Sequence, residues 1–263
     1  MVDVMVTDHG LSVRLACRAA RLARSAYYAP TTAKNDMPAI SAIEGYIGEN
    51  QQHGFDKLYP VVRRQGFGKT VLYRVYKALG LNKKRRRKRR LPARIKEPLA
   101  VPVGPNEVWS LDFMSDALWS GRRFRTFNVL DDFAREALRI EIDTSLPAAR
   151  VVRALDQLVE IRGRPRRLRM DNGPELISNT LAKWAKRHAI NLLFIQPGRP
   201  MQNGYIERFN RTYREEVLNA YVFDTLNEVR RMTAEWLVGY NERRPHESLG
   251  NLSPQQYLMS KSL

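Results

Sequence analysis

The sequence predicts an α/β fold for residues 106–263, with a mixed five-stranded sheet flanked by helices, preceded by a small all-α region. Two observations predict this fold class. After residue 105, short runs rich in Val, Ile, Leu and Phe alternate with helical periodicity, in the order three strands, helix, strand, helix, strand, helix. Before residue 83, apolar residues recur at helical spacing, and a run of cations and prolines separates the two parts.

The charge of the chain is uneven. The formal net charge is +18 and the isoelectric point is about 10.4. Residues 1–100 hold 21 Lys and Arg against 7 Asp and Glu, whereas residues 101–263 hold 24 against 20. A basic first part joined to a nearly balanced globular part is typical of a nucleic-acid-binding protein. The alternative is a basic protein that is merely soluble, and an arginine-rich excess of this size disfavours it.

Several classes of protein are excluded by composition. The single cysteine, Cys17, lies among Leu and Ala, so we expect a core residue rather than a disulfide, a thiolate zinc site or a catalytic thiol. No apolar run approaches the roughly 20 residues of a membrane-spanning helix, and the N-terminus lacks the order of a secretion signal. These features predict a protein of the reducing cytoplasm without a membrane partner.

We expect four segments, bounded where the apolar periodicity stops. The first resembles a helix-turn-helix, because Leu11–Tyr28 reads as two short helices with Ser12 and Ser25 as candidate N-caps. A basic helical pair that only packs fits that pattern equally well. The segments are a helix-turn-helix-like segment (1–30), a small helical DNA-binding unit (31–82), a basic, Pro-containing linker (83–105) and the α/β domain with a C-terminal helix and tail (106–263).

The second segment predicts helices over 39–52, 55–66 and 69–79. Val71, Leu72 and Val75 are among the residues we expect on the buried side of the last of these. The cations expected on the outside are Arg63, Arg64, Lys69, Arg74 and Lys77.

Eight consecutive cations open the linker. Like charges repel and keep such a run extended and solvated. Next to a duplex, the same run would release counterions and bind without sequence preference. These candidate DNA-binding residues are Lys83, Lys84, Arg85, Arg86, Arg87, Lys88, Arg89 and Arg90.

The core elements follow from periodicity. Strands are expected over 108–112, 124–130, 137–142, 167–170 and 191–195, and helices over 147–162, 177–188, 203–221 and 225–243. In such sheets, sites gather at strand ends and neighbouring helix termini. Asp112 and Asp171 fall at two strand ends, and the helix over 203–221 carries Glu207.

These three carboxylates are candidate catalytic residues and metal ligands. Residues 172–206, 35 in number, separate Asp171 from Glu207. Carboxylate oxygens suit Mg²⁺ or Mn²⁺, and two such ions roughly 4 Å apart can support phosphodiester chemistry. Asp112, on a central strand, is the best candidate to bridge both ions. Without metal, the clustered carboxylates repel, so we expect at least one raised pKa.

The helix that carries Glu207 predicts a DNA-contacting face. The face includes Asn203, Asn210 or Arg211, and Arg214, which lie one or two turns from Glu207. Ile206 and Phe209 belong to an adjacent apolar stripe. Arginines beside a metal-binding carboxylate suit phosphate contacts. An intrahelical pair between Glu207 and Arg211 on a solvated face is the alternative for this helix taken alone.

Other acids fit a metal site less well. Asp116 is expected beyond the first strand, Asp131 and Asp132 in a turn that they cap, and Glu175 at a helix N-terminus that it caps. His188 and His246 are expected to be structural or surface residues. The sequence contains no phosphate-binding loop or dinucleotide fingerprint, so ATP and NAD are not implied.

The motifs together resemble those of a known family. They read W-S-L-D-F-M-S-D, R-M-D-N-G-P-E, I-Q-P-G-R-P-M-Q-N-G-Y-I-E-R-F-N and Y-N-E-R-R-P-H-E-S-L-G-N-L-S-P-Q-Q-Y. They resemble the retroviral-integrase-like DDE transposases, above all the second-frame product, OrfB, of the bacterial insertion-sequence-three family. The resemblance covers residues 11–258.

This resemblance implies a ribonuclease-H-like catalytic core and Mg²⁺-dependent cleavage and strand transfer at insertion-sequence ends. It implies that Asp112, Asp171 and Glu207 are the metal ligands and that Arg214 contacts the terminal DNA. It also implies double-stranded DNA as partner, a homo-oligomeric active complex, and a first-frame (OrfA) partner or fusion. A non-catalytic DNA-binding regulator of transposition and a structure-selective nuclease on the same fold are the alternatives.

Overall fold

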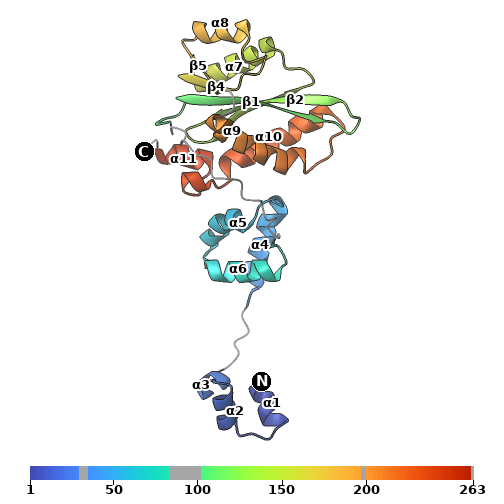
Figure 1. Cartoon of the computed structure of the whole chain (residues 1–263), viewed down its shortest axis with the longest axis vertical. Coiled ribbons are helices and arrows are strands. Elements are labelled where there is room, and N and C mark those ends of the chain that lie inside the picture. The colour runs from blue at the N-terminus through green and yellow to red at the C-terminus, as the bar shows by residue number, and fades with distance from the viewer. Residues whose placement is uncertain (30–34, 83–101, 197–199, 262–263) are drawn as a thin grey trace.

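The computed structural model describes residues 1–29, 35–82, 102–196 and 200–261. The predicted cation run, residues 83–90, lies outside the described residues. The described strands form one mixed sheet in the order β3-β2-β1-β4-β5 (Figure 1). The strands β1, β2 and β3 pair antiparallel, and β4 pairs parallel with both β1 and β5. Their bounds are Val108–Ala117 (β1), Arg123–Asp131 (β2), Glu136–Asp143 (β3), Arg167–Met170 (β4) and Asn191–Phe194 (β5).

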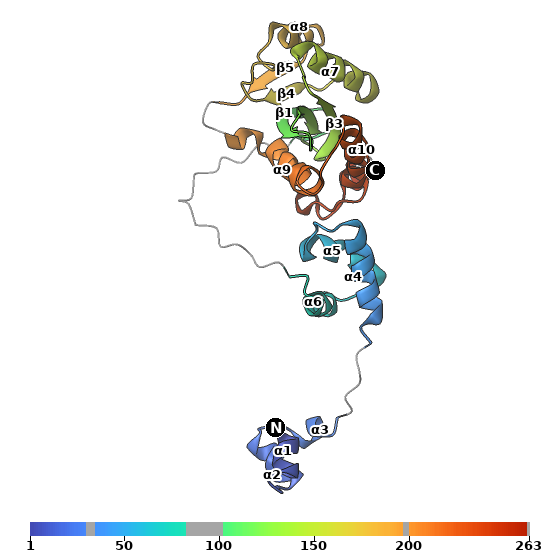
Figure 2. The same ribbon diagram turned by 90° about the vertical axis from the view of Figure 1, so that its right-hand side faces the viewer.

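Helices cover both faces of the sheet, so the predicted α/β architecture is confirmed (Figures 1 and 2). The helices α7 (Ala148–Arg162) and α8 (Asn179–Arg187) pack on one face, and α9 (Gly204–Tyr213) and α10 (Leu226–Glu242) pack on the other. Side chains alternate along β1, so Trp109 and Leu111 join the core under α7 and α8. The even-numbered residues, Asp112 among them, therefore face α9.

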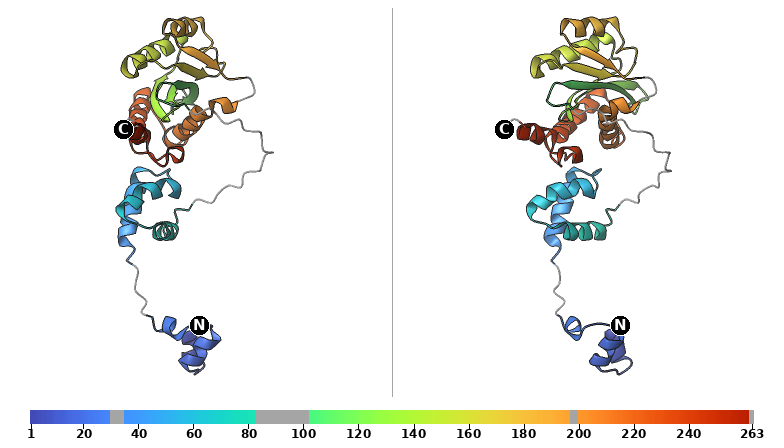
Figure 3. Two further views of the ribbon diagram at one scale, coloured as in Figure 1. Left: turned by 90° about the vertical axis from the view of Figure 1, so that its left-hand side faces the viewer. Right: turned by 60° about the vertical axis from the view of Figure 1, so that its left-hand side comes forward.

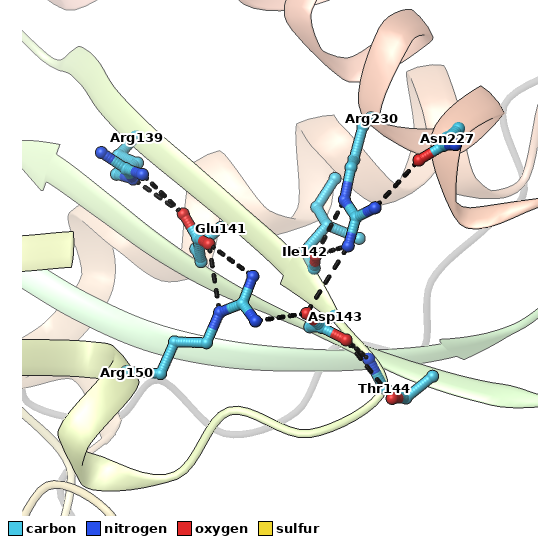
Figure 4. A network of polar contacts seen from close by, with 8 residues as sticks. All are labelled: Arg139, Glu141, Ile142, Asp143, Thr144, Arg150, Asn227 and Arg230. Carbon is cyan, nitrogen blue, oxygen red and sulfur yellow. Dashed lines mark hydrogen bonds and ion pairs between the residues drawn. The ribbon is translucent and has the colours of Figure 1, made fainter. Parts of the chain in front are cut away.

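The edge strand β3 is tied to helices of both layers by one polar network (Figure 4). Arg150 of α7 pairs with Glu141 and Asp143. From α10, Arg230 donates two hydrogen bonds to the carbonyl oxygen of Ile142, at 2.9 and 3.1 Å. The pairs are partly exposed, so each stabilises the fold only modestly, but together they fix α7 and α10 to the same strand.

The long helix predicted over 203–221 is interrupted, and that prediction is wrong in its second half. The helix α9 ends at Tyr213 and continues as a π-helical turn, η3 (Arg214–Leu218). The wider π turn changes which side chains face inward. It lets two consecutive residues, Val217 and Leu218, both enter the core under β1 and β2.

The described part of the N-terminal half is helical. Ser12 caps α2 as predicted, but Ser25 caps no helix, because α3 begins at Arg24 and has only four residues. Arg21 supplies the left-handed turn residue, with φ 54°, a conformation that glycine adopts more readily. The first helix was not predicted. The helices are α1 (Val2–Thr7), α2 (Val13–Ala19), α3 (Arg24–Tyr27), α4 (Met37–Glu49), α5 (Phe55–Val62) and α6 (Lys69–Ala78), with a 3₁₀ turn, η1, at Arg63–Gln65.

The helices α4, α5 and α6 share a small core around Ile43, Leu58 and Leu72. Val71, predicted to be buried, is 41% exposed on α6. The loop between α4 and α5 contacts the α/β domain, as the ribbon views agree (Figures 1 and 3). There the Arg244 guanidinium lies 2.8 Å from Nε2 of His53, and both side chains contact Glu216.

The remaining described elements are short helical segments of the C-terminal part. None of the described helices is both long and apolar enough to cross a membrane. The short elements of the C-terminal part are η2 (Pro200–Asn203), η4 (Glu247–Leu249) and α11 (Pro254–Lys261).

Candidate active site

The parallel register of β1 and β4 brings two of the three predicted acids together. Ser110 of β1 is opposite Arg169 of β4. Asp112 lies two residues after Ser110, and Asp171 lies two residues after Arg169. Because β1 and β4 run in the same direction, the two acids lie side by side on the face of the sheet that α9 covers. Both side chains are partly exposed, which leaves them accessible from solvent.

The Asp112 carboxylate is held by two hydrogen bonds. Its Oδ1 accepts from the backbone N–H of Phe113 at 2.8 Å, and its Oδ2 accepts from Nδ2 of Asn210 at 2.7 Å. Burial, together with the negative charges of Asp171 and Glu207, raises the pKa of Asp112 to about 6, against the opposing effect of these two hydrogen bonds. At least one raised pKa was predicted among the acids without metal, and both Asp112 and Glu207 have one.

The third acid reaches the site from α9. Glu207 lies in the first turn of this helix, three residues before Asn210. Burial raises the pKa of Glu207, and the charge of Arg211 opposes this change. The buried amide of Asn210 also accepts a hydrogen bond from Nδ2 of Asn128 at 2.7 Å. Asn128 is the β2 partner of Asp112, so one amide ties the helix to both central strands.

Asn203 does not lie on the face where it was predicted. It precedes α9 as the N-cap residue and is only 3% exposed. Its Nδ2 donates to the carbonyl oxygen of Leu111 at 3.4 Å. Asn203 therefore supports β1 next to Asp112 and does not present itself to a bound duplex.

The loop after Asp171 depends on a glycine. The backbone N–H of Gly173 donates to Oδ1 of Asp171 at 3.0 Å. A Cβ at Gly173 would stand 3.0 Å from that same oxygen, closer than side chains normally approach. The loop is anchored by Glu175, which pairs with Arg125 of β2. Glu175 is thus an ion-pair partner, and Ser178 is the N-cap of α8, so the predicted capping role of Glu175 is wrong.

Arg214 and Arg211 differ in their surroundings. Arg214 donates to the carbonyl oxygen of Ser115 at 2.9 Å and to Asp116 at 3.1 Å. Asp116 was expected beyond the strand, but β1 extends to Ala117, so Asp116 lies on the same face as Asp112. Arg211 is exposed. The positive charge of Arg211 acts on the Glu207 carboxylate, whereas Arg214 is held at Asp116.

Two further acids are structural. Asp131 accepts from the N–H of Phe133 at 2.8 Å, which agrees with the predicted turn cap. Asp132 is fully buried, where it pairs with Arg169 at 2.6 Å and accepts from Ser110 at 2.7 Å. Because these partners satisfy the Asp132 carboxylate, it is not free to bind a metal ion.

The three candidate acids suit a hard divalent cation by their chemistry. In the described part of the chain, no three His, Cys, Asp or Glu side chains are already arranged around one point. However, the raised pKa of Asp112 comes partly from the charges of Asp171 and Glu207. A cation among the carboxylates would remove that repulsion, and carboxylate oxygens are the ligands that Mg²⁺ and Mn²⁺ prefer.

Comparison with known proteins decides the family. Two models of the integrase core domain match the chain, over residues 102–200 and 188–254. The uncharacterized 31.7 kDa protein of insertion element IS407 from Burkholderia multivorans is 41% identical over 251 residues, 94% of this chain and 90% of that protein. The uncharacterized 39.2 kDa protein of insertion element IS476 from Xanthomonas euvesicatoria is 38% identical over 260 residues, 96% of this chain and 74% of that protein. The chain belongs to the integrase-core (DDE) transposases of insertion elements.

A solved structure agrees with the fold of this transposase. The simian T-cell lymphotropic virus intasome, in complex with the PP2A regulatory subunit B56 gamma, matches with a TM-score of 0.52 and 16% identity. The match covers 81% of this chain and 73% of that chain. The predicted ribonuclease-H-like core is therefore confirmed. The transposase is an enzyme of the polynucleotidyl transferase type, a family that uses divalent metal ions.

Three features of the transposase site escaped the sequence interpretation. Asn210 was expected on the DNA-contacting face, although its spacing of three residues from Glu207 fits an inward amide equally well. The need for Gly173 could be suspected from D-N-G-P alone, but only the fold shows that it lies against Asp171. The pairing of Arg125 with Glu175 joins residues 50 apart and leaves no local signal.

Proposed function

We propose that Asp112, Asp171 and Glu207 together hold two divalent metal ions, either Mg²⁺ or Mn²⁺. We propose further that this metal centre cleaves DNA strands at insertion-sequence ends and transfers them to target DNA. The observation that carries the proposal is the β1–β4 register, which sets Asp112 beside Asp171, together with the hydrogen bond from α9 to Asp112. When bound, such ions activate the attacking oxygen and stabilise the leaving oxygen.

The chain's own side chains supply positioning. Asn210 fixes the Asp112 carboxylate and sets the height of α9, and hence of Glu207, above β1. Gly173 lets the Asp171 carboxylate lie close to its loop. Arg211 is free to contact a phosphate of the DNA end, and Arg214 can do so by exchanging its bond to Asp116 for one to DNA.

The proposed partner is double-stranded DNA, at the element ends and at the target. The cations of residues 83–90 and the basic helical segments would hold the duplex by counterion release. We also propose that the active complex contains more than one copy of the chain, that the first-frame product assists end binding, and that the reaction takes place in the cytoplasm. These proposals are supported by the charge distribution and by the family.

The test is strand transfer in vitro. The purified chain is incubated with a labelled DNA fragment from the end of its element and Mg²⁺, with and without the first-frame product. Wild type should cut and join the fragment, and Asp171→Asn should lose at least about 100-fold of the rate. Asp224→Asn, which removes an exposed acid from a loop, is the matched control and should keep the rate. Binding without metal-dependent cutting, with or without the first-frame product, would leave only a DNA-binding regulator.

The role of the cation run has its own measurement. Each phosphate contact that is lost should lower the slope of log K against log salt by about 0.9. A variant with residues 83–90 changed to glutamine should therefore show a clearly smaller slope. An unchanged slope would remove the run from the DNA interface.

A further inference from the structure

An exposed tryptophan stands at the tip of the β1–β2 hairpin. Trp119 is 78% exposed, whereas Trp109 and Trp184 are fully buried and Trp236 is half-buried, with its Nε1 hydrogen-bonded to Glu216. Tryptophan is rarely left in water, because its ring offers a large apolar area. A tryptophan this exposed therefore suggests a ligand.

The hairpin tip is held rigidly. The N–H of Leu118 donates to the carbonyl oxygen of Arg122 at 3.0 Å, and the N–H of Gly121 donates to that of Leu118 at 2.8 Å. Gly121 has a φ of +79°, which favours glycine. The N–H of Trp119 donates to the carbonyl oxygen of Phe223 at 2.8 Å, so the tip is joined to the loop before α10. The indole is thus presented by a fixed backbone.

The surroundings of the indole are aromatic and cationic. The same loop carries Tyr221, which is 52% exposed. Arg122 and Arg123 follow Trp119 on the hairpin, both exposed, and neither forms an ion pair within the described residues. Aromatic rings interleaved with arginines are typical of surfaces that bind single-stranded nucleic acid, where rings stack on bases and cations contact phosphates. Free arginines at this patch make a phosphate backbone a better occupant than a second, equally basic copy of this chain.

The patch formed by Trp119, Arg122 and Arg123 lies past the end of β1, the strand that carries Asp112. Trp119 is seven residues beyond Asp112 along β1, which corresponds to about 23 Å at 3.3 Å per residue. At about 3.4 Å per nucleotide, the rise of a strand whose bases stay stacked, this length corresponds to roughly six or seven nucleotides. Arg214, bound to Asp116, lies between the two positions. A strand leaving the acids could therefore run past Arg214 to the indole.

We propose that Trp119, Arg122 and Arg123 form a binding site for an unpaired DNA strand, with one base stacked on the indole about six nucleotides from the cleaved phosphate. The location of that phosphate rests on the proposed function. The binding of the strand does not, because it needs no metal.

The experiment uses intrinsic fluorescence of the full chain in EDTA. The probe is a single-stranded 20-mer of deoxythymidine, compared with a blunt duplex of equal length. The difference in acrylamide quenching between wild type and Trp119→Phe reports on the indole of residue 119 alone. The single strand should shield this indole from acrylamide, and the duplex should shield it less. Trp119→Ala should bind the single strand about 5- to 150-fold more weakly than Trp119→Phe, because alanine removes the stacking ring.

Ile161→Ala is the matched control, since Ile161 is 76% exposed on α7, on the opposite face of the sheet. It should bind like wild type. Equal quenching of Trp119 with and without saturating single strand would overturn the proposal, as would equal binding by Trp119→Ala and Trp119→Phe. Shielding that grows with protein concentration in the absence of DNA would also overturn it and assign the patch to a second copy.

The two proposals fail separately. Strand transfer with an unshielded Trp119 would remove the single-strand site and keep the metal-dependent reaction. A shielded Trp119 without metal-dependent strand transfer would keep the binding site and remove the reaction.

Discussion

Removal of the Asn210 amide is the sharpest test of how the site is assembled. Asn210→Ala deletes a hydrogen bond to the Asp112 carboxylate and one from Nδ2 of Asn128, each 2.7 Å long. A hydrogen bond to a charged group contributes about 1.5–3 kcal/mol and a neutral one about 1 kcal/mol. The variant should therefore lose about 3 kcal/mol of unfolding free energy. Groups that orient a metal ligand typically cost 10- to 100-fold in metal affinity or activity when removed, so strand transfer should fall by about that factor.

The control is another asparagine with two hydrogen bonds. Asn241 of α10 accepts from the N–H of Ala137 and donates to its carbonyl oxygen, both at 2.9 Å, away from the acids. Asn241→Ala should lose about 2 kcal/mol, measured by urea unfolding, and keep its strand-transfer rate at a temperature where it is folded. If Asn210→Ala and Asn241→Ala retain equal activity per folded molecule, Asn210 does not position the acids.

Two further perturbations follow from the structure. Gly173→Ala places a Cβ 3.0 Å from Oδ1 of Asp171, so strand transfer should fall about 10-fold or more with little change in melting temperature. Gly104→Ala, in a loop where no atom lies within 4 Å of the added Cβ, should match wild type. An active Gly173→Ala would contradict the close approach. Burial alone would raise the pKa of Glu216, but the hydrogen bond from His53 and the nearby guanidinium hold it at about 2. Since this pKa is depressed on folding, its contribution of about 3 kcal/mol is complete above pH 4.5 and is lost as pH falls to 2 and below. The unfolding free energies of wild type and Glu216→Gln in urea should therefore differ most near pH 7 and converge only near pH 2, and a constant difference would refute the assignment.

Most strands and helices of the α/β domain could be predicted from the sequence, because the apolar pattern within each segment indicates its type. The second and third strands, predicted over 124–130 and 137–142, extend by only one residue at each end in the structure. The first strand was predicted to stop at Asp112, because Ser115 and Asp116 interrupt the apolar pattern. Its extension to Ala117 comes from pairing with β2, where Ser115 lies opposite Arg125. This extension depends on the partner strand of the hairpin, which the apolar periodicity of the first strand does not show.

The acids themselves were predictable, whereas their supports were not. The spacing of Asp171 and Glu207 and the motif around Asp112 are visible in one dimension. The inward amide of Asn210 depends on how α9 lies across β1, since the two bonded residues are 98 positions apart. The burial of Asn203 has the same origin, because its partner on β1 lies 92 positions earlier. Helical spacing groups Asn210 and Arg211 with Glu207 but does not tell which of the two meets the sheet.

The helix that carries Glu207 is fixed at two points of different chemistry. In the second half of α9, Asn210 donates a hydrogen bond to Asp112 of the sheet. In the π turn that follows, Glu216 binds Arg244 and His53, and His53 belongs to the basic helical unit. The π turn is what allows this division, because it buries Val217 and Leu218 together while Glu216 turns toward the helical unit. A single continuous run of residues, 204–218, thus joins the acids that we propose act on DNA to the unit that we propose holds it. The depressed pKa of Glu216 means that this second anchor is charged, and therefore intact, throughout the neutral range.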